Sequence, residues 1–234
     1  MSPIPSEQEL AAAACHFGHR KEKWNPKMAP FLYGTRKGIH VFDLAKTREG
    51  LEKVCAQMRE LQAKGKTILF VSTKQQSIPL IEKIAGSLGQ PMVTKKWIAG
   101  LLTNWPTIKR RLKYYLDLQR SFQTGEVEKY TKKEQTELRK KLAKLDTALA
   151  GVAHMTGLPD AVFVLDAVRD RVAVLEAAKL NIPLYGICDS IADPDLFNAF
   201  IPGNDDAVKA ISLFLETLEK ELSGAKPKKA SDEE

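Results

Sequence analysis

Residues 161–187 read AVFVLDAVRDRVAVLEAAKLNIPLYGI and decide the fold of this 234-residue chain. The apolar runs from Ala161 to Leu165 and from Leu184 to Ile187 predict two buried strands, and the sequence near Arg169 to Leu180 predicts a helix between them. A strand–helix–strand unit of this kind is typical of parallel strands joined by a crossover helix. The unit therefore predicts a parallel sheet covered by helices.

The flanking sequence continues the alternation. Thr67 to Val71 predicts another buried strand, followed by a helix that begins at Ser72 or Thr73. The other expected elements are a short helix from Glu7 to Cys15, an apolar strand from Ile39 to Phe42, a helix capped by Thr47 and running to about Lys64, a brief strand from Pro91 to Thr94, an edge strand from Ala199 to Ile201 and a final helix from Asp205 to Leu222. We expect an α/β fold with a doubly wound, mainly parallel sheet of the flavodoxin or Rossmann type.

Residues 105–149 depart from this alternation. Apolar or long side chains spaced by three and four residues form two stripes, a pattern typical of helices packed along a seam. The stripes are Trp105, Ile108, Leu112, Tyr115, Gln119 and Phe122, then Leu138, Leu142, Leu145 and Leu149. We expect an inserted antiparallel helical hairpin (105–149), an N-terminal helix (1–15), a basic aromatic arm (16–38), an α/β domain in two pieces (39–104 and 150–222) and a disordered tail (223–234).

The positive charge is concentrated in two blocks. The formal net charge is +7, yet residues 16–48 contain eight Lys or Arg against two acids, and residues 95–150 contain fourteen against six. The rest of the chain is therefore net acidic. Such a distribution is typical of a protein that places particular surfaces on a polyanion.

The arm from His16 to Lys37 combines cations with aromatic rings. Basic side chains neutralise phosphates and aromatic faces stack on bases, while Pro26 and Pro30 favour an extended segment. Phe17, Phe31 and Tyr33 add rings to it. The candidate RNA-binding residues of the arm are Arg20, Lys21, Lys23, Trp24, Lys27, Arg36 and Lys37.

Two further regions carry candidate phosphate contacts. The hairpin contains Arg110, Arg111, Arg139 and Lys140 without balancing acids nearby. These cations either contact RNA or only keep the outer face of an exposed coiled coil in contact with water. The strand at residues 67–71 is followed by the hydroxyls of Ser72 and Thr73 and by Lys74. One interpretation is that they bind a single phosphate at a helix N-terminus, and the other is that they only cap that helix.

An enzymatic alternative uses acids that follow predicted strands. The chain contains no Gly-x-Gly and no P-loop, so neither phosphate-binding signature is present. Asp43, Asp166 and Asp189 could form a magnesium site of an enzyme or of a phosphoacceptor-like regulatory domain, although the first two can also cap helices. A third alternative is a protein-binding module that uses the hairpin.

A structural zinc or magnesium site has only partial support. The side chains that could contribute are His16, His19, Asp189, Asp205 and Asp206. Two histidines fall short of a tetrahedral set, and the paired acids suit the start of the final helix. We expect no cofactor.

The three cysteines, Cys15, Cys55 and Cys188, are odd in number and far apart. This spacing predicts reduced thiols in a cytosolic protein rather than a disulfide framework. No signal peptide or run of membrane-spanning length is recognisable, so we expect a soluble cytoplasmic protein.

Five motifs occur in an order and spacing that resemble one family. They are His16-Phe17-Gly18-His19, Trp24-Asn25-Pro26-Lys27-Met28, Leu102-Thr103-Asn104-Trp105, Gly157-Leu158-Pro159-Asp160 and Ile201-Pro202-Gly203-Asn204-Asp205-Asp206-Ala207. From about Leu10 to Leu222 the chain is similar to the bacterial family of small-subunit ribosomal protein two. It departs from the family where Lys96-Trp97-Ile98-Ala99-Gly100 replaces Arg-Trp-Leu-Gly-Gly and where Lys74 is followed by Gln75.

The resemblance implies a structural constituent of the small ribosomal subunit, seated between head and body in the cytoplasm. It implies rRNA contacts through the arm and hairpin, with Lys74 and Lys96 as additional candidates. It also implies contacts with neighbouring ribosomal proteins and help in holding ribosomal protein one, which captures messenger RNA. Catalysis, a small-molecule substrate, a membrane and a homo-oligomer are not implied.

Overall fold

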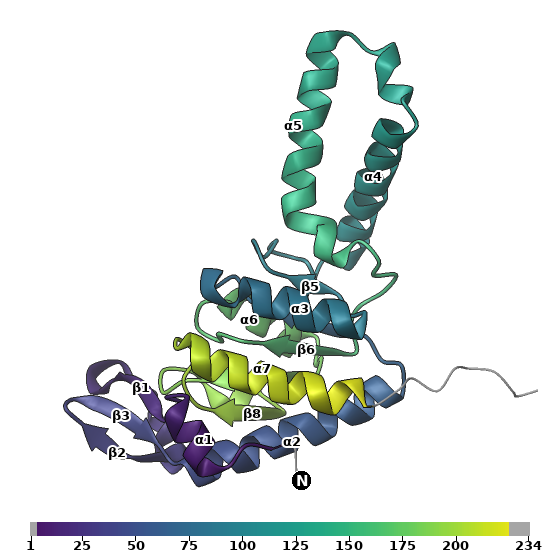
Figure 1. Cartoon of the computed structure of the whole chain (residues 1–234). Helices are drawn as coiled ribbons and strands as arrows, with labels where there is room; N and C mark the ends of the chain where they lie inside the picture. The colour runs from purple at the N-terminus through teal and green to yellow at the C-terminus, as the bar shows by residue number, and fades with distance from the viewer. Residues whose placement is uncertain (1–3, 225–234) are drawn as a thin grey trace, which may run out of the picture.

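The computed structural model describes residues 4–224, which form a five-stranded parallel sheet and a three-stranded antiparallel sheet. Figure 1 shows how the helices and strands are arranged. In chain order the elements are α1 (Glu7–Ala12), β1 (Phe17–Arg20), β2 (Leu32–Arg36), β3 (Ile39–Phe42), α2 (Leu44–Ala63), β4 (Ile68–Val71), α3 (Ile78–Leu88), β5 (Met92–Val93), α4 (Trp105–Gln123), α5 (Lys132–Leu149), β6 (Ala161–Val164), α6 (Arg171–Lys179), β7 (Leu184–Cys188), β8 (Ala199–Pro202) and α7 (Val208–Ser223).

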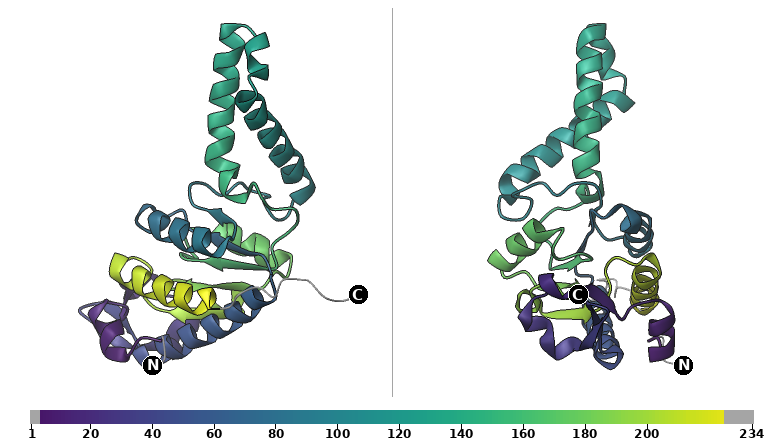
Figure 2. Two further views of the ribbon diagram at one scale, coloured as in Figure 1. Left: turned by 45° about the vertical axis from the view of Figure 1, so that its right-hand side comes forward. Right: turned by 90° about the vertical axis from the view of Figure 1, so that its left-hand side faces the viewer.

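The parallel sheet has the strand order β5-β4-β6-β7-β8, with every neighbouring pair parallel. Successive residues of each strand face opposite sides, so Phe70 and Phe163 enter one core while Leu69 and Val162 enter the other. Helices α2, α3 and α7 cover the first face and α6 covers the second (Figure 2). The predicted doubly wound, mainly parallel α/β fold is confirmed.

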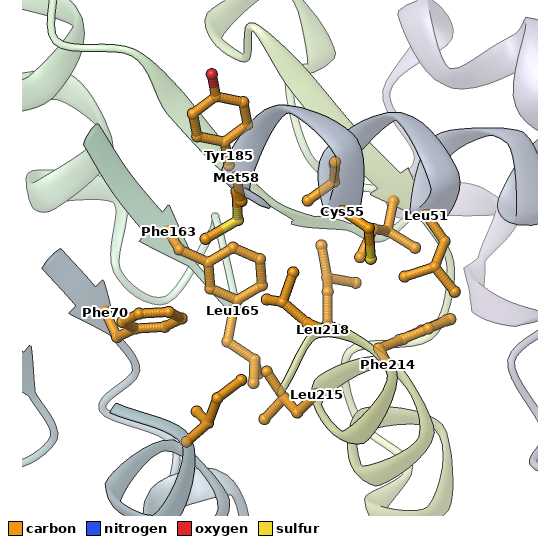
Figure 3. Close-up of a cluster of buried hydrophobic side chains, with 14 of the residues drawn as sticks. Leu51, Cys55, Met58, Phe70, Phe163, Leu165, Tyr185, Phe214, Leu215 and Leu218 are labelled. Atoms are coloured by element: carbon orange, nitrogen blue, oxygen red, sulfur yellow. The ribbon is translucent and has the colours of Figure 1, made fainter. Parts of the chain in front are cut away.

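The larger core lies between the sheet and helices α2 and α7 (Figure 3). The rings of Phe70 and Phe163 are 5.5 Å apart at the centre of the sheet, and Met58 of α2 and Phe214 of α7 are fully buried beside them. Each large apolar side chain buried in this way contributes about 1.5–3 kcal/mol. The sheet is therefore a rigid platform for the surfaces attached to it.

The arm is folded, which corrects the prediction of an extended segment. Strands β1, β2 and β3 form an antiparallel sheet of order β1-β3-β2, in which Arg36 pairs with Ile39 and Phe17 with Val41. Lys37 and Gly38 both have positive φ, 51° and 78°, as a tight two-residue hairpin loop requires. We call β1, β2 and β3 with their connections the small sheet.

Pro26 and Pro30 lie in a 3-10 helix, Pro26–Phe31, inside the connection between β1 and β2. The side chain of Asn25 caps this helix by accepting from the backbone N–H of Lys27 at 3.1 Å. The prolines therefore shape a turn of the small sheet rather than an extended arm.

Three predicted helix starts are wrong. Asp43, not Thr47, caps α2, because its carboxylate accepts from the N–H of Ala45 at 3.0 Å. The hydroxyl of Thr47 instead donates to the carbonyl of Pro202 at 2.7 Å. α3 begins at Ile78 rather than at residue 72 or 73, and α7 begins at Val208 rather than at residue 205.

Helices α4 and α5 stand away from the parallel sheet (Figures 1 and 2). They occupy the chain between β5 and β6, and they contact each other where the hydroxyl of Tyr115 donates to Asp146 at 2.7 Å. Ile108 and Leu112 of the first predicted stripe are buried, as is Leu149 of the second.

Within residues 4–224, no helix is both long enough and apolar enough to cross a bilayer. All three cysteines are buried and unpaired, in agreement with the predicted free thiols. The predicted disordered tail lies outside the described residues from position 225 onward.

Candidate nucleic-acid interface

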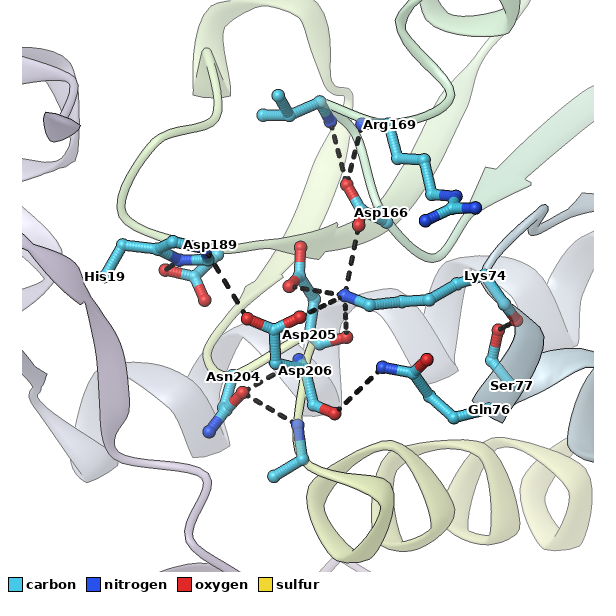
Figure 4. Close-up of polar contacts among 12 residues, drawn as sticks. His19, Lys74, Gln76, Ser77, Asp166, Arg169, Asp189, Asn204, Asp205 and Asp206 are labelled. Atoms are coloured by element: carbon cyan, nitrogen blue, oxygen red, sulfur yellow. Dashed lines mark hydrogen bonds and ion pairs between the residues drawn. The ribbon is translucent and has the colours of Figure 1, made fainter.

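A cluster of charged side chains fills the carboxyl end of the parallel sheet (Figure 4). The Lys74 side chain, only 7% exposed, extends from the third residue after β4, and its Nζ lies 3.1 Å from Asp166, which follows β6. The same ammonium lies 3.1 Å from Asp205 and 2.6 Å from Asp206. The strand order reverses between β4 and β6, where sheets of this type usually bind ligands. Here the chain's own lysine and carboxylates meet at that crevice.

The charges of this cluster depend on one another. Burial alone would lower the pKa of Lys74, but the carboxylates of Asp205, Asp206 and Asp166 raise it above its ordinary value. Burial and repulsion by Asp166 and Asp189 raise the pKa of Asp205 to about 8. Lys74 is thus a buried cation fully engaged by carboxylates of the chain, and its contact with RNA stays a prediction.

The first strand of the small sheet is fixed to this end of the parallel sheet by His19 and its neighbours. The His19 Nδ1 lies 3.1 Å from Asp189, and its backbone N–H donates to the hydroxyl of Ser190 at 2.9 Å. The bond to Asp189 raises the pKa of His19 to about 9, although burial opposes this. Asn204 donates from its side-chain amide to the carbonyl of Ala14 at 3.1 Å. These contacts hold the small sheet in one orientation.

The three acids of the enzymatic alternative do not converge. Asp43 follows β3 in the small sheet and caps α2. Asp166 accepts from the N–H groups of Val168 and Arg169 and pairs with Lys74, while Asp189 pairs with His19. Each carboxylate therefore has a structural partner.

The metal-site candidates are only partly brought together. His19, Asp189 and Asp206 are neighbours, whereas the ring of His16 stacks on Phe17 at 4.1 Å. Among the residues that the structure describes, no group of three or more His, Cys, Asp or Glu is arranged to hold a metal ion. The absence of a cofactor remains a prediction.

Most cations of the small sheet have no ion-pair partner in the described part of the chain. Arg20, Lys21, Lys23, Arg36 and Lys37 are exposed and form no ion pair within residues 4–224. Lys27 differs, because its ammonium lies 3.0 Å from Asp193 and 2.7 Å from Asp195. The five free cations make the small sheet a positive surface.

The aromatic residues of the arm have separate roles. Tyr33 is 83% exposed, and Phe17 is also exposed. Trp24 is half-buried with its ring 5.0 Å from that of His40, and Phe31 packs edge-on against Phe200 at 4.9 Å. Tyr33 is therefore the ring available for stacking, because Phe17 contacts His16 while Trp24 and Phe31 pack against other rings.

A second positive surface lies on α4 and α5. Arg110 and Arg111 of α4, and Arg139 and Lys140 of α5, are exposed and have no ion pair among the described residues. Lys96, in the loop that leads to α4, is exposed as well. These predicted contacts are free to meet a phosphate.

Glu176 is a structurally important residue that the sequence reasoning missed. This buried carboxylate of α6 accepts from the Trp97 indole N–H at 3.0 Å, from the N–H groups of Gly100, Leu102 and Thr103, and from the Thr103 hydroxyl. Burial alone would raise the pKa of Glu176, but these donors lower it below its ordinary value. Glu176 thereby fixes the loop that carries α4. Its signal in the sequence is a single acid in an otherwise apolar and basic helix.

Comparison with known proteins connects this architecture with the ribosome. A sequence profile for ribosomal protein S2 matches residues 10–224. The chain is 43% identical over 216 residues to the small ribosomal subunit protein uS2 of Rhodospirillum rubrum, covering 92% of this chain and 82% of that protein. It is 44% identical over 207 residues to uS2 of a Nitratiruptor species (88% and 78% coverage) and 43% identical over 208 residues to uS2 of Thermus thermophilus (89% and 81% coverage).

The match to the profile spans nearly all of the described residues, and each of these relatives is aligned over more than three quarters of its own length. The chain therefore belongs to the ribosomal protein S2 family, whose members are structural components of the small ribosomal subunit and not enzymes.

Proposed function

We propose that this protein binds small-subunit rRNA through two separate basic surfaces, the small sheet and the outer faces of α4 and α5. The observation that carries the proposal is the set of exposed cations that have no ion pair within residues 4–224, which contrasts with the complete pairing of Lys74 inside the molecule. A cation that is already paired with a carboxylate adds little to the affinity for RNA. A cation without such a partner can neutralise a phosphate and release its counterion, which strengthens binding.

The small sheet suits a folded RNA. Arg20, Lys21 and Lys23 follow one another around the end of β1, and Arg36 and Lys37 lie at the adjacent hairpin turn. Tyr33 in β2 adds an exposed ring. Phosphate contacts of this kind position a protein without reading sequence, which matches a scaffold rather than a regulator.

The two surfaces are held apart by the parallel sheet, so the protein would bridge separate RNA elements between the head and body of the subunit. In that position it would support the docking of ribosomal protein one and contact neighbouring ribosomal proteins. We further propose that this cytoplasmic role needs no cofactor. No step of it involves turnover.

The test is the salt dependence of binding to small-subunit rRNA. The triple variant Arg20→Gln, Lys21→Gln, Lys23→Gln should bind more weakly, and the slope of log affinity against log salt should fall by about 2–3. A matched control removes three exposed lysines that are paired with acids, Lys46→Gln, Lys64→Gln and Lys83→Gln. Equal slopes for the two variants would contradict the proposal.

Docking is measured on reconstituted subunits. Subunits assembled with the triple variant of the small sheet should retain less of this protein in a sucrose gradient, and should carry correspondingly less ribosomal protein one. Full retention of both proteins would show that docking does not depend on the basic surface, and would contradict this part of the proposal.

A further inference from the structure

We propose that the distal half of the α4–α5 pair forms a docking groove for a basic, partly apolar segment of a neighbouring protein. The inference deepens the proposed function, on which it depends for its ribosomal setting. We call this feature the distal groove. It has a volume of about 480 Å³ and is lined by residues of α4, of α5 and of the connection between them.

The apolar part of the distal groove is unusually open. Tyr114 is 40% exposed and Tyr130 is 45% exposed, while Leu118 and Val127 lie buried beneath them. Exposed tyrosines around an apolar floor are typical of protein interfaces, because a ring buries a large area at a small cost in side-chain entropy. The groove therefore offers a site for one or two apolar side chains.

The charge of the lining selects the partner. Asp117 and Glu137 line the groove and form no ion pair within the described part of the chain. The Glu134 carboxylate accepts from the N–H and hydroxyl of Thr131, which leaves its negative charge uncompensated. These three carboxylates outnumber the single ammonium in the lining, that of Lys141, so the groove repels a phosphate backbone and attracts arginine or lysine. A basic protein segment fits this groove, and RNA does not.

The tyrosine rings already accept cations. The ammonium of Lys141 lies 4.6 Å from the centroid of the Tyr114 ring, and that of Lys129 lies 5.5 Å from the Tyr130 ring. Both lie within the range of cation–π attraction. A guanidinium from a partner would replace these ammonium groups on the rings, and the carboxylates of the groove would hold it there.

The distal groove is separate from the proposed RNA contacts. None of Arg110, Arg111, Arg139 or Lys140 lines it, although all four belong to the same two helices. The helix pair thus has a basic surface and an acidic aromatic groove. Two surfaces of opposite character would allow one projection to contact RNA and protein together.

Photo-crosslinking from the full-length chain in reconstituted small subunits tests the inference. A benzoylphenylalanine probe replaces Tyr130, and the matched control carries it at Leu116, an exposed position of α4 that does not line the groove. The Tyr130 probe should crosslink a peptide of another ribosomal protein that contains two or more Arg or Lys beside an apolar residue. The Leu116 probe should not crosslink that peptide. Crosslinks from position 130 only to rRNA, or none to any protein, would overturn the inference.

A second measurement does not depend on subunit assembly. The free full-length chain is titrated with a synthetic peptide of alternating arginine and leucine, and the variant Asp117→Asn, Glu137→Gln should bind it at least fivefold more weakly. The control Glu49→Gln, Glu60→Gln removes two exposed acids from α2 and should bind as the unmodified chain does. Equal affinity of all three proteins would overturn the inference. Loss of rRNA binding with peptide binding intact would overturn only the proposed function.

Discussion

The carboxyl end of the parallel sheet and the small sheet use the same kinds of charged residue in opposite ways. At the sheet end, Lys74 is buried and meets three carboxylates within 3.1 Å. On the small sheet, Arg20, Lys21 and Lys23 are exposed with no carboxylate partner among the described residues. Charge that is satisfied inside the molecule stabilises the fold, whereas charge left unpaired at the surface remains available to a polyanion.

The largest stability effect should come from breaking the buried half of this comparison. Lys74→Met leaves Asp166 and Asp205 without their ammonium partner and Asp206 with only His19, 3.5 Å away, and should lower the free energy of unfolding by about 3–5 kcal/mol. Urea denaturation measures the loss. The control Lys64→Met removes only an exposed pair with Glu60 and should cost less than about 1 kcal/mol. A loss of similar size in both variants would contradict a structural role for the cluster.

The attachment of α4 should be the next most sensitive feature. Glu176→Gln replaces a carboxylate that accepts five hydrogen bonds with an amide that can accept at only one atom, and should cost about 2 kcal/mol. Hydrogen exchange should show faster exchange of the amides of Leu102 and Thr103. Unchanged protection of these amides would contradict the assignment.

The pH dependence of Glu176 follows from its lowered pKa. Its contribution to stability is present above the ordinary glutamate value of 4.5 and is lost as the pH falls through the lower pKa of the folded state. Glu176→Gln should therefore lose less stability on acidification than the unmodified protein. Parallel acid unfolding curves would contradict this.

His19 should make stability fall on the alkaline side. Its pKa is raised from 6.5 to about 9, so the folded state retains a proton that the unfolded state releases between these values. The free energy of unfolding should therefore decrease as the pH rises from about 6.5 to 9, and Asp205 contributes in the same direction up to about pH 8.

His19→Gln should remove about 1 kcal/mol at pH 6.5 and flatten this slope. Urea unfolding at pH 6, 7.5 and 9 measures it. A slope equal to that of the unmodified protein would show that the contact with Asp189 does not persist in solution.

The exposed half of the comparison should show almost no effect on stability. Arg20→Gln, Lys21→Gln, Lys23→Gln should change the free energy of unfolding by less than about 0.5 kcal/mol, although it weakens RNA binding. Urea denaturation of the same protein used for the RNA measurements checks this. Marked destabilisation would mean that these cations support the small sheet itself.

Removal of divalent metal should have no effect. Because the His19–Asp189 contact and the Lys74 cluster are held by the chain's own charges, the melting temperature should be the same within about 1 °C with and without EDTA. Differential scanning calorimetry makes the comparison. A decrease of several degrees would indicate a structural metal and contradict the prediction that no cofactor is needed.

The strands of the parallel sheet are predictable from sequence because β4 and β6 are buried at every position, and β7 likewise. Such short apolar runs leave little choice of structure. Helix starts are less predictable, because several polar residues can cap. Asp43 and Thr47 are both good candidates for the cap of α2. The Thr47 hydroxyl instead donates to the carbonyl of Pro202, 155 positions further along the chain, and Asp43 becomes the cap.

The arm and Lys74 show where local reasoning fails. The arm contains proline and many charges, which do not suggest strands. Its strands form because β3 pairs with β1 on one side and with β2 on the other. Lys74 follows a strand like many ligand-binding residues, yet its partners lie 92 and 131 positions further along the chain. The cations at positions 20, 21, 23, 36 and 37 of the arm and at positions 110, 111, 139 and 140 of α4 and α5 are exposed, and their contact with RNA stays a prediction.

The bonds that fix the small sheet also set an order of folding during synthesis. The backbone N–H of His19 donates to the hydroxyl of Ser190, 171 positions later in the chain. The carbonyl of Ala14 accepts from the side-chain amide of Asn204, 190 positions later. A chain made from its N-terminus exposes the basic segment early but supplies those partners only when most of the protein has emerged. The small sheet can therefore pair its own strands early, but its orientation on the parallel sheet is fixed only after residues 190 and 204 have been made.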